Sequence, residues 1–335
     1  MSAKKYEIVK SESIVYNGRR LYRIRALLRD FNTISGEKIH KGDLGGYVES
    51  ENNLSQEGTC WIYNGAKVCG DAKVLDDAFV YNTAEVFENA KIYGNACIFD
   101  NAKIYGNAKI FDNAEVFDFS EVFDNAEVCG KARVYGNACV FDSAKIYGNA
   151  KIFDDARVCD NARIFGFAKI FNKAIVYGNA KVYGNTQIFG KAKVYGNAEV
   201  YENAAIFDYA FIFGDAKVFS NAKIFGTTWL YGAAKIDDKL NLNKGKYIFA
   251  TLNIDETLSE IEPICYKISF AVRVIELKLP IEQGYIESLV SELAKYDELI
   301  DYFHSNECEI IFTPNENKIY KLLLQSKQNI ENFYK

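Results

Sequence analysis

Two histidines are the side chains of this 335-residue chain best suited to proton transfer near neutral pH. His40 stands beside Lys41 and close to Asp43 in a short polar segment, and His304 ends a stretch with the apolar spacing of a helix. A general base also needs a partner that orients it, and neither histidine belongs to a motif that supplies one. We therefore interpret His40 as a solvated loop residue and His304 as a surface residue near a helix C-terminus.

Eight cysteines could supply thiolates, metal ligands or disulfides. Cys139 and Cys159 are expected on neighbouring turns of one face, but their diagonal offset exceeds the reach of a disulfide. With only two histidines in the chain, we expect no metal site and no cofactor. Unpaired cysteines and the absence of an apolar leader or membrane-spanning run favour a cytoplasmic protein with reduced thiols. The cysteines are Cys60, Cys69, Cys97, Cys129, Cys139, Cys159, Cys265 and Cys308.

Basic residues interleaved with aromatic rings form a second chemical pattern, which we call the Lys/Tyr face. Such a pattern can stack single-stranded nucleic acid or bind an anionic polymer. The alternative is that lysine stems lie over the rings with their charges in water. The alternative fits better, because nearby turn residues are rich in Asp and the formal net charge is −5. The candidate residues are Lys91, Lys109, Lys145, Arg163, Lys181, Tyr93, Tyr147 and Tyr183.

A third pattern is apolar, and we call it the Phe face. Its rings recur every eighteen residues, and its neighbours include Trp61, Phe79, Cys97 and Ala205. We expect most of these rings to stack on one another. A stripe this long still exceeds what a soluble monomer leaves bare, which makes it the best candidate for self-association or for a protein partner. The candidate residues are Phe99, Phe117, Phe153, Phe171, Phe189, Phe207 and Phe225.

All three patterns are set by one six-residue repeat, which runs thirty times from Ile62 to Asn241 without losing register. Each copy has an aliphatic residue, usually a ring, two turn residues, usually Ala, and usually a charged or polar residue. Strand alternation places the first and fifth residues inside and the second and sixth outside. Strands of about four residues and corners built from Gly, Asn and Asp predict three-sided coils, about ten in all.

The repeat resembles the hexapeptide pattern of left-handed β-helix proteins, with its aliphatic residue first and its small residue fifth. The segment Gly42–Ser50, followed by Asn53–Ser55 and Cys60–Tyr63, is similar to the start of the YdcK-like group of bacteria and phages. The resemblance covers roughly residues 15 to 241 and implies that the coil is left-handed. It also raises an acyltransferase alternative, because many such proteins transfer an acyl group from an acyl-CoA donor with a histidine base. His40 and His304 are catalytic candidates only under that alternative.

The repeat lacks both features of those enzymes, since no inserted loop interrupts it and no histidine lies within it. We therefore expect a non-catalytic scaffold or interaction protein, a homo-oligomer or a binder of an unidentified protein partner. The acyltransferase is one alternative, and a binder of nucleic acid or anionic glycan along the Lys/Tyr face is another. Binding to a membrane is not expected.

The fold class is therefore mainly β, a left-handed parallel β-helix flanked by two terminal units that prevent end-to-end strand pairing. Residues 1–55 are expected to form an N-terminal β cap with a hairpin turn at Asn17–Gly18. Residues 56–241 form the hexapeptide-repeat β-helix. Residues 242–335 lose the repeat and predict a small C-terminal α/β unit, with a strand near Tyr247–Leu252.

Overall fold

A computed structural model describes residues 4–27, 31–32, 36–232, 234–237, 241–243, 246–249 and 325. The predicted α/β unit falls almost entirely outside these residues, as do His304, Cys265 and Cys308. Contacts divide the chain into two compact units. One unit comprises Met1–Thr228 with Lys235–Lys244, and the other comprises Trp229–Ala234 with Gly245–Lys335.

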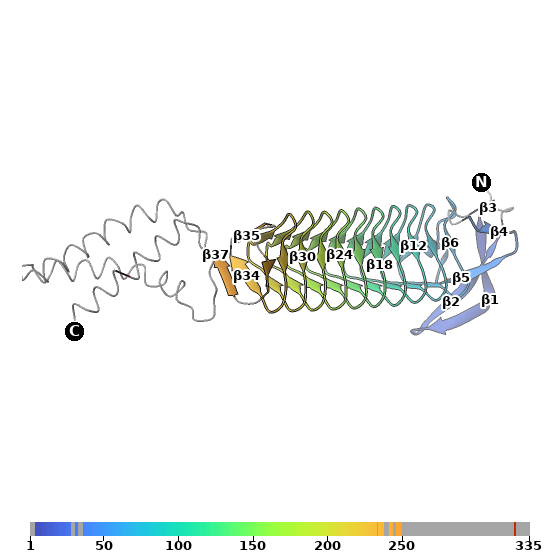
Figure 1. The fold of residues 1–335 in the computed structure, drawn as a ribbon. Coiled ribbons are helices and arrows are strands. Elements are labelled where there is room, and N and C mark those ends of the chain that lie inside the picture. The colour runs from blue at the N-terminus through green and yellow to red at the C-terminus, as the bar shows by residue number, and fades with distance from the viewer. Residues whose placement is uncertain are drawn as a thin grey trace, which may run out of the picture. The chain divides into compact units, whose positions relative to one another are not determined.

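The repeat region folds as a parallel β-solenoid, whose coils follow one another along a rod in Figure 1. Corresponding residues of successive coils lie 18 apart in sequence, and each coil contributes one strand to each of three sheets. About ten coils result, which confirms the predicted solenoid. We call the sheets I, II and III.

Within each sheet, the strands of successive coils pair in parallel. Sheet I contains β7 (Lys67–Val68), β10 (Glu85–Val86), β13 (Lys103–Ile104), β16 (Glu121–Val122), β19 (Cys139–Val140), β22 (Arg157–Val158), β25 (Ile175–Val176), β28 (Lys193–Val194) and β31 (Phe211–Ile212). Sheet II contains β8 (Lys73–Val74), β11 (Lys91–Ile92), β14 (Lys109–Ile110), β17 (Glu127–Val128), β20 (Lys145–Ile146), β23 (Arg163–Ile164), β26 (Lys181–Val182), β29 (Glu199–Val200), β32 (Lys217–Val218) and β35 (Lys235–Ile236). Sheet III contains β6 (Trp61–Ile62), β9 (Phe79–Val80), β12 (Cys97–Ile98), β15 (Glu115–Val116), β18 (Arg133–Val134), β21 (Lys151–Ile152), β24 (Lys169–Ile170), β27 (Gln187–Ile188), β30 (Ala205–Ile206), β33 (Lys223–Ile224) and β36 (Asn241–Leu242).

These strands have two residues, shorter than the four predicted, because the flanking ring and alanine also close the corner. The N–H of Ala108 donates to the carbonyl oxygen of Tyr105 at 3.3 Å across the turn. The coil-to-coil bonding nevertheless continues beyond the strand, since the N–H of Tyr105 donates to the carbonyl oxygen of Val122 at 3.1 Å. Strand β36 also carries the pairing beyond Asn241, because Leu242 pairs with Ile224.

The interior of the solenoid holds the first and fifth residues of the repeat, as predicted. Ile104 and Ala108 are both 0% exposed, and the same is true of nearly every equivalent position. Three fifth positions carry a hydroxyl residue in place of alanine and are also 0% exposed. Each hydroxyl donates to a carbonyl oxygen three residues earlier, from Ser120 to Phe117 at 2.7 Å, Thr186 to Tyr183 at 2.6 Å and Thr228 to Phe225 at 2.8 Å. The polar substitutions therefore leave no buried donor unpaired.

Positive φ at the corners falls on the third residue of the repeat, which is most often Gly and otherwise usually Asp. Gly106 has φ +67° and Asp112 has φ +57°, and among the described fourth residues only Gly65, in the first copy, has a positive φ. Aspartate is tolerated here because its carboxylate bonds to the next coil: Oδ2 of Asp118 accepts from the N–H of Gly136 at 2.9 Å. Fourth-position asparagines bond in turn along the rod, with Nδ2 of Asn107 donating to Oδ1 of Asn125 at 3.1 Å.

The N-terminal strands join sheet I. Strands β1 (Tyr6–Tyr16) and β2 (Arg19–Ala26) form the predicted hairpin around Asn17–Gly18, and β2 pairs with β5 (Leu44–Val48), which pairs in parallel with β7. A Cβ on Gly45 would lie 2.5 Å from Cγ1 of Ile24 and from the carbonyl oxygen of Ile62. Glycine is therefore required where β5 meets the first coil. Strands β3 (Phe31–Asn32) and β4 (Lys38–Ile39) pair with each other, and the short helix η1 is Glu51–Asn53.

In the other unit, β34 (Trp229–Gly232) pairs in parallel with β37 (Lys246–Phe249). Strand β37 overlaps the strand predicted near Tyr247–Leu252. Within the described residues, no helix is long and apolar enough to cross a membrane. The boundaries proposed at residues 55 and 241 and the capping role of the flanks remain predictions.

Candidate functional faces and edges

The Phe face, which is the outer face of sheet III, carries a continuous ladder of stacked rings. From Tyr81 to Phe225 every neighbouring pair of rings is parallel within 9°, with centroids 4.5 to 5.0 Å apart. Tyr63 meets Tyr81 edge-on at 6.0 Å. The rings thus cover one another's faces and present their edges outward, which confirms the predicted stacking.

The first coils of the Phe face are less exposed than the sequence indicated. Trp61, Phe79 and Cys97 are only 1%, 8% and 8% exposed, although the alternation directs their side chains outward. They belong to the core and do not widen an exposed stripe. The ladder rings of the same coils, Tyr63, Tyr81 and Phe99, remain partly exposed.

Two large exposed rings beside the ladder were missed in the sequence. Phe119 is 65% exposed and Tyr209 is 53% exposed, both at the fourth position of the corner between sheets III and I. An aromatic residue in a turn slot normally held by Asn or Asp is the signal that would have identified them. They are isolated rings five coils apart beside the ladder, and the corner positions between them are Asn137, Asp155, Lys173 and Lys191.

The ring ladders of the other two sheets are interrupted. On sheet II, stacking runs from Tyr93 to Phe111, stops at Cys129, and resumes from Tyr147. On sheet I it stops at Cys159 between Phe141 and Tyr177. The Phe face is therefore the longest unbroken aromatic surface among the described residues.

The Lys/Tyr face, which is the outer face of sheet II, is partly neutralised by two glutamates. Glu127 lies between Lys109 and Lys145, at 3.0 and 2.9 Å, and Glu199 lies between Lys181 and Lys217. Hydrogen bonds from Lys145 and Lys109 lower the pKa of Glu127, and Lys181 and Lys217 do the same for the pKa of Glu199. Tyr147 and Tyr183 each stack on Phe165, at 4.8 and 4.7 Å, and Tyr93 stacks on Phe111 at 4.9 Å.

The other two candidate bases of this face, Lys91 and Arg163, have no carboxylate partner among the described residues. Since three of the five candidate bases are already paired, the face offers a polyanion fewer free charges than its sequence implies.

His40 is exposed near the N-terminal strands, away from the coils. Its backbone N–H donates to Oδ2 of Asp43 at 2.7 Å, and the N–H of Asp43 donates to the His40 carbonyl oxygen at 3.0 Å. This reciprocal pair of bonds fixes the backbone of the loop that carries the imidazole. His304 falls outside the described residues.

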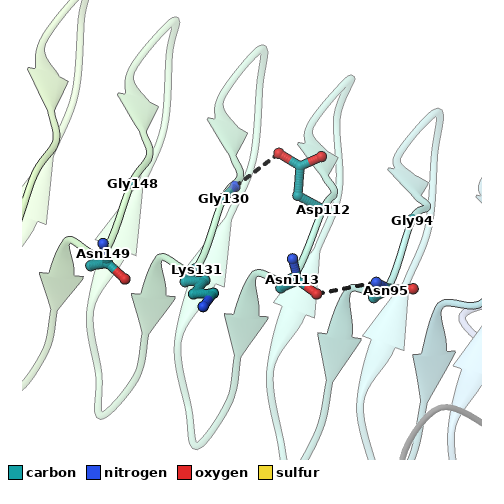
Figure 2. Close-up of a pocket in the computed structure, with 8 residues that line it drawn as sticks. All are labelled: Gly94, Asn95, Asp112, Asn113, Gly130, Lys131, Gly148 and Asn149. Atoms are coloured by element: carbon teal, nitrogen blue, oxygen red, sulfur yellow. Dashed lines mark hydrogen bonds between the residues drawn. The ribbon is translucent and has the colours of Figure 1, made fainter.

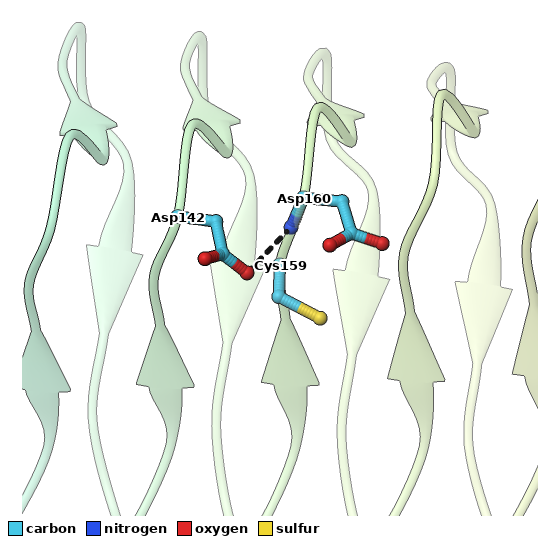
Figure 3. A group of neighbouring side chains, drawn as sticks. All are labelled: Asp142, Cys159 and Asp160. Carbon is cyan, nitrogen blue, oxygen red and sulfur yellow. Dashed lines mark hydrogen bonds between the residues drawn. The ribbon is translucent and has the colours of Figure 1, made fainter.

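One cluster of possible metal ligands lies on the corner between sheets I and II (Figure 3). Ligand atoms of Asp142, Cys159 and Asp160 all lie within 4.8 Å of one another. The carboxylates already bond along the rod, since Oδ2 of Asp142 accepts from the Asp160 N–H at 3.2 Å and Oδ2 of Asp160 from the Gly178 N–H at 2.8 Å. Burial, and then the two carboxylates, raise the pKa of Cys159 to about 11. We interpret the cluster as ordinary corner bonding beside a protonated thiol.

A shallow groove of about 520 Å³ follows the corner between sheets II and III (Figure 2). We call this corner the II–III edge. Backbone glycines and asparagine amides line the groove, together with Lys131 and Asp112. Oδ2 of Asp112 accepts from the Gly130 N–H at 3.1 Å, and Nδ2 of Asn95 donates to Oδ1 of Asn113 at 3.1 Å. The repeat pattern did not single out this edge, because glycine in a corner is expected on conformational grounds alone.

Comparison with known proteins adds no assignment: no protein-family model matches the chain, and no curated protein matches it.

Proposed function

We propose that this chain is a non-catalytic interaction rod that associates with a second copy of itself through the Phe face. The observation that carries this proposal is the unbroken ladder from Tyr81 to Phe225, in contrast to the interrupted ladders of sheets I and II. Its ring edges form an apolar stripe that a second rod can match along its length. Burial of such a stripe contributes about 25 cal/mol per Å² to association.

We further propose a left-handed coil of the hexapeptide-repeat type, with a resemblance to the YdcK-like group. Support comes from the repeat itself, whose aliphatic first residue and small fifth residue both fill the interior. The flanking segments are proposed to cap the ends of the solenoid. Strand β2 provides one element of such a cap, because it pairs with β5 at the start of sheet I.

No feature of the described residues favours the acyltransferase alternative. His40 lies in the N-terminal segment, and the coil register continues without an inserted loop from Ile62 to Ile224. A thermal-shift titration with acetyl-CoA separates the two classes. We expect no saturable shift, whereas a saturable shift together with acyl transfer lost in His40→Ala or His304→Ala would overturn the non-catalytic assignment.

The self-association proposal predicts a mass above that of the monomer at micromolar protein. Light scattering over a salt series measures it. Residues 1–45 are basic, with ten Lys and Arg against five acids, and residues 246–335 are acidic, with nine against fifteen. Apolar association persists as salt is raised, whereas end-to-end pairing of these two flanks weakens as the screening length shrinks to about 3 Å near 1 M salt. A monomer at every salt concentration would refute association through the Phe face.

A further inference from the structure

The II–III edge differs from the other two corners of the rod in charge. Over four successive coils its turn residues contain no carboxylate: they are Gly130–Lys131, Gly148–Asn149, Gly166–Phe167 and Gly184–Asn185. The other two corners carry acids along the same stretch of the rod, including Asp118, Asp124, Asp142, Asp154, Asp155 and Asp160. In a chain of net charge −5, this edge is a local gap in the negative surface.

Cations border the same gap. Arg133, Lys151 and Lys169 are in-register neighbours on successive strands of sheet III, two residues beyond the corner. Arg133 pairs with Glu115 at 2.7 Å and lies over the rings of Phe117 and Tyr135. Neither Lys151 nor Lys169 has a carboxylate partner among the described residues, and the same holds for Lys131 on the corner itself. Like charges directly opposite each other destabilise a sheet, so an anion bound beside Lys151 and Lys169 would relieve their repulsion.

Backbone donors along the edge are also unused. At Gly130 the N–H is taken by Asp112 of the preceding coil. The N–H groups of Gly148, Gly166 and Gly184 follow a glycine in the preceding coil, and within the described residues they have no acceptor. On the next three coils no carboxylate takes the place that Asp112 has at Gly130. The open N–H groups of these coils are therefore one strand spacing apart, about 4.8 Å.

We propose that the II–III edge binds a linear acidic polysaccharide that carries one carboxylate per sugar and runs along the rod axis. Lys131, Lys151 and Lys169 neutralise its carboxylates, and the open glycine N–H groups hydrogen-bond them. The side-chain amide of Asn149, which has no partner among the described residues, bonds sugar hydroxyls. Phe167, 60% exposed, supplies an apolar contact for a sugar ring.

The edge favours this ligand over single-stranded nucleic acid. Base stacking needs open ring faces, and the sheet II rings that precede the edge cover each other, as Tyr147 and Phe165 do at 4.8 Å and Phe165 and Tyr183 at 4.7 Å. The site adjoins the association stripe on the outer face of sheet III. On β18, β21 and β24 the cation follows the II–III edge, while the ring precedes the opposite corner, as Lys151 and Phe153 do.

Binding of polygalacturonate to the full chain at low ionic strength tests the proposal, with fully methyl-esterified polygalacturonate and oligo-dT as comparison ligands. We expect binding of the acid form, weakening with added salt, and none of the neutral ester. The variant Lys131→Gln/Lys151→Gln/Lys169→Gln should lose about tenfold in affinity. The matched variant Lys73→Gln/Lys91→Gln/Lys235→Gln, which removes unpaired lysines from sheet II, should change affinity by less than about twofold.

A second variant addresses the backbone donors. Gly148→Asp places a carboxylate where Asp112 stands in an earlier coil, so it should occupy the Gly166 N–H and weaken binding while the protein still folds. Absence of binding to polygalacturonate, equal loss in both lysine variants, unchanged binding by Gly148→Asp, or tighter binding of oligo-dT would overturn the proposal.

Discussion

The Nζ atom of Lys145 lies 2.9 Å from Oε2 of Glu127, on the adjacent strand of sheet II. Oε1 of the same glutamate accepts from Lys109 at 3.0 Å, so one carboxylate joins three consecutive strands. Glu199 repeats this arrangement with Lys181 and Lys217 four coils later. Each glutamate divides a row of bases that the sequence presents as nearly continuous.

Removal of Glu127 should lower stability in a pH-dependent way. Its pKa is lowered in the fold, so the pairing stabilises the protein above the ordinary carboxyl pKa and is lost as pH falls through the folded value. We expect Glu127→Gln to cost about 0.5 kcal/mol near pH 7, because the lysines are largely solvated. Thermal melts of both proteins at pH 7 and near pH 3 check this. An equal difference at both pH values would contradict the pairing.

Enlarging an inward alanine should overpack the solenoid axis. Ala108 is 0% exposed, and Ala108→Leu is expected to destabilise by about 1–3 kcal/mol in denaturant unfolding. Ala205→Leu is the matched control, since Ala205 occupies the outward sixth position of β30 and its side chain is only partly buried. Equal effects of the two substitutions would refute the inward assignment of the fifth position.

Completion of a broken ladder should stabilise the rod. Cys129 stands between the stacks that end at Phe111 and begin at Tyr147. Cys129→Phe is expected to raise stability by about 0.5–1.5 kcal/mol through two new ring contacts. Cys129→Leu, which adds apolar area without a ring, separates stacking from burial. Denaturant unfolding of the three proteins measures the difference, and a phenylalanine variant no more stable than the leucine variant would contradict a stabilising role for ring stacking.

The sequence predicted the coil well because its information is local and periodic. The alternation that buries Ile104 and Ala108 and directs Tyr105 outward follows from the six-residue repeat. The pairing of Lys109, Glu127 and Lys145 could also have been predicted, since their 18-residue spacing places them on adjacent strands. The burial of Trp61 and Phe79 could not be predicted from the sequence. The repeat sets the direction of a side chain but does not show which other residues cover it.

The II–III edge was missed for a different reason. Gly148 and Gly166 adopt a positive φ, which glycine favours. This backbone requirement alone explains glycine at both positions, so nothing in the sequence suggested a binding role. Only the structure shows that aspartate serves that conformation equally well elsewhere and bonds the next coil, which leaves the glycine edge with open donors. The site depends on a comparison among corners that single residues do not reveal.

The central claim, association through the Phe face, is tested most directly by sedimentation of two ring-deleted variants beside the wild type. Phe153→Lys/Phe171→Lys/Phe189→Lys breaks the ladder of sheet III, and Phe165→Lys/Tyr183→Lys/Tyr201→Lys breaks an equal length of ladder on sheet II. We predict that the sheet III variant sediments as a monomer at micromolar concentration, while the sheet II variant keeps the wild-type mass at every salt concentration. A sheet III variant with the mass of the wild type would contradict the account.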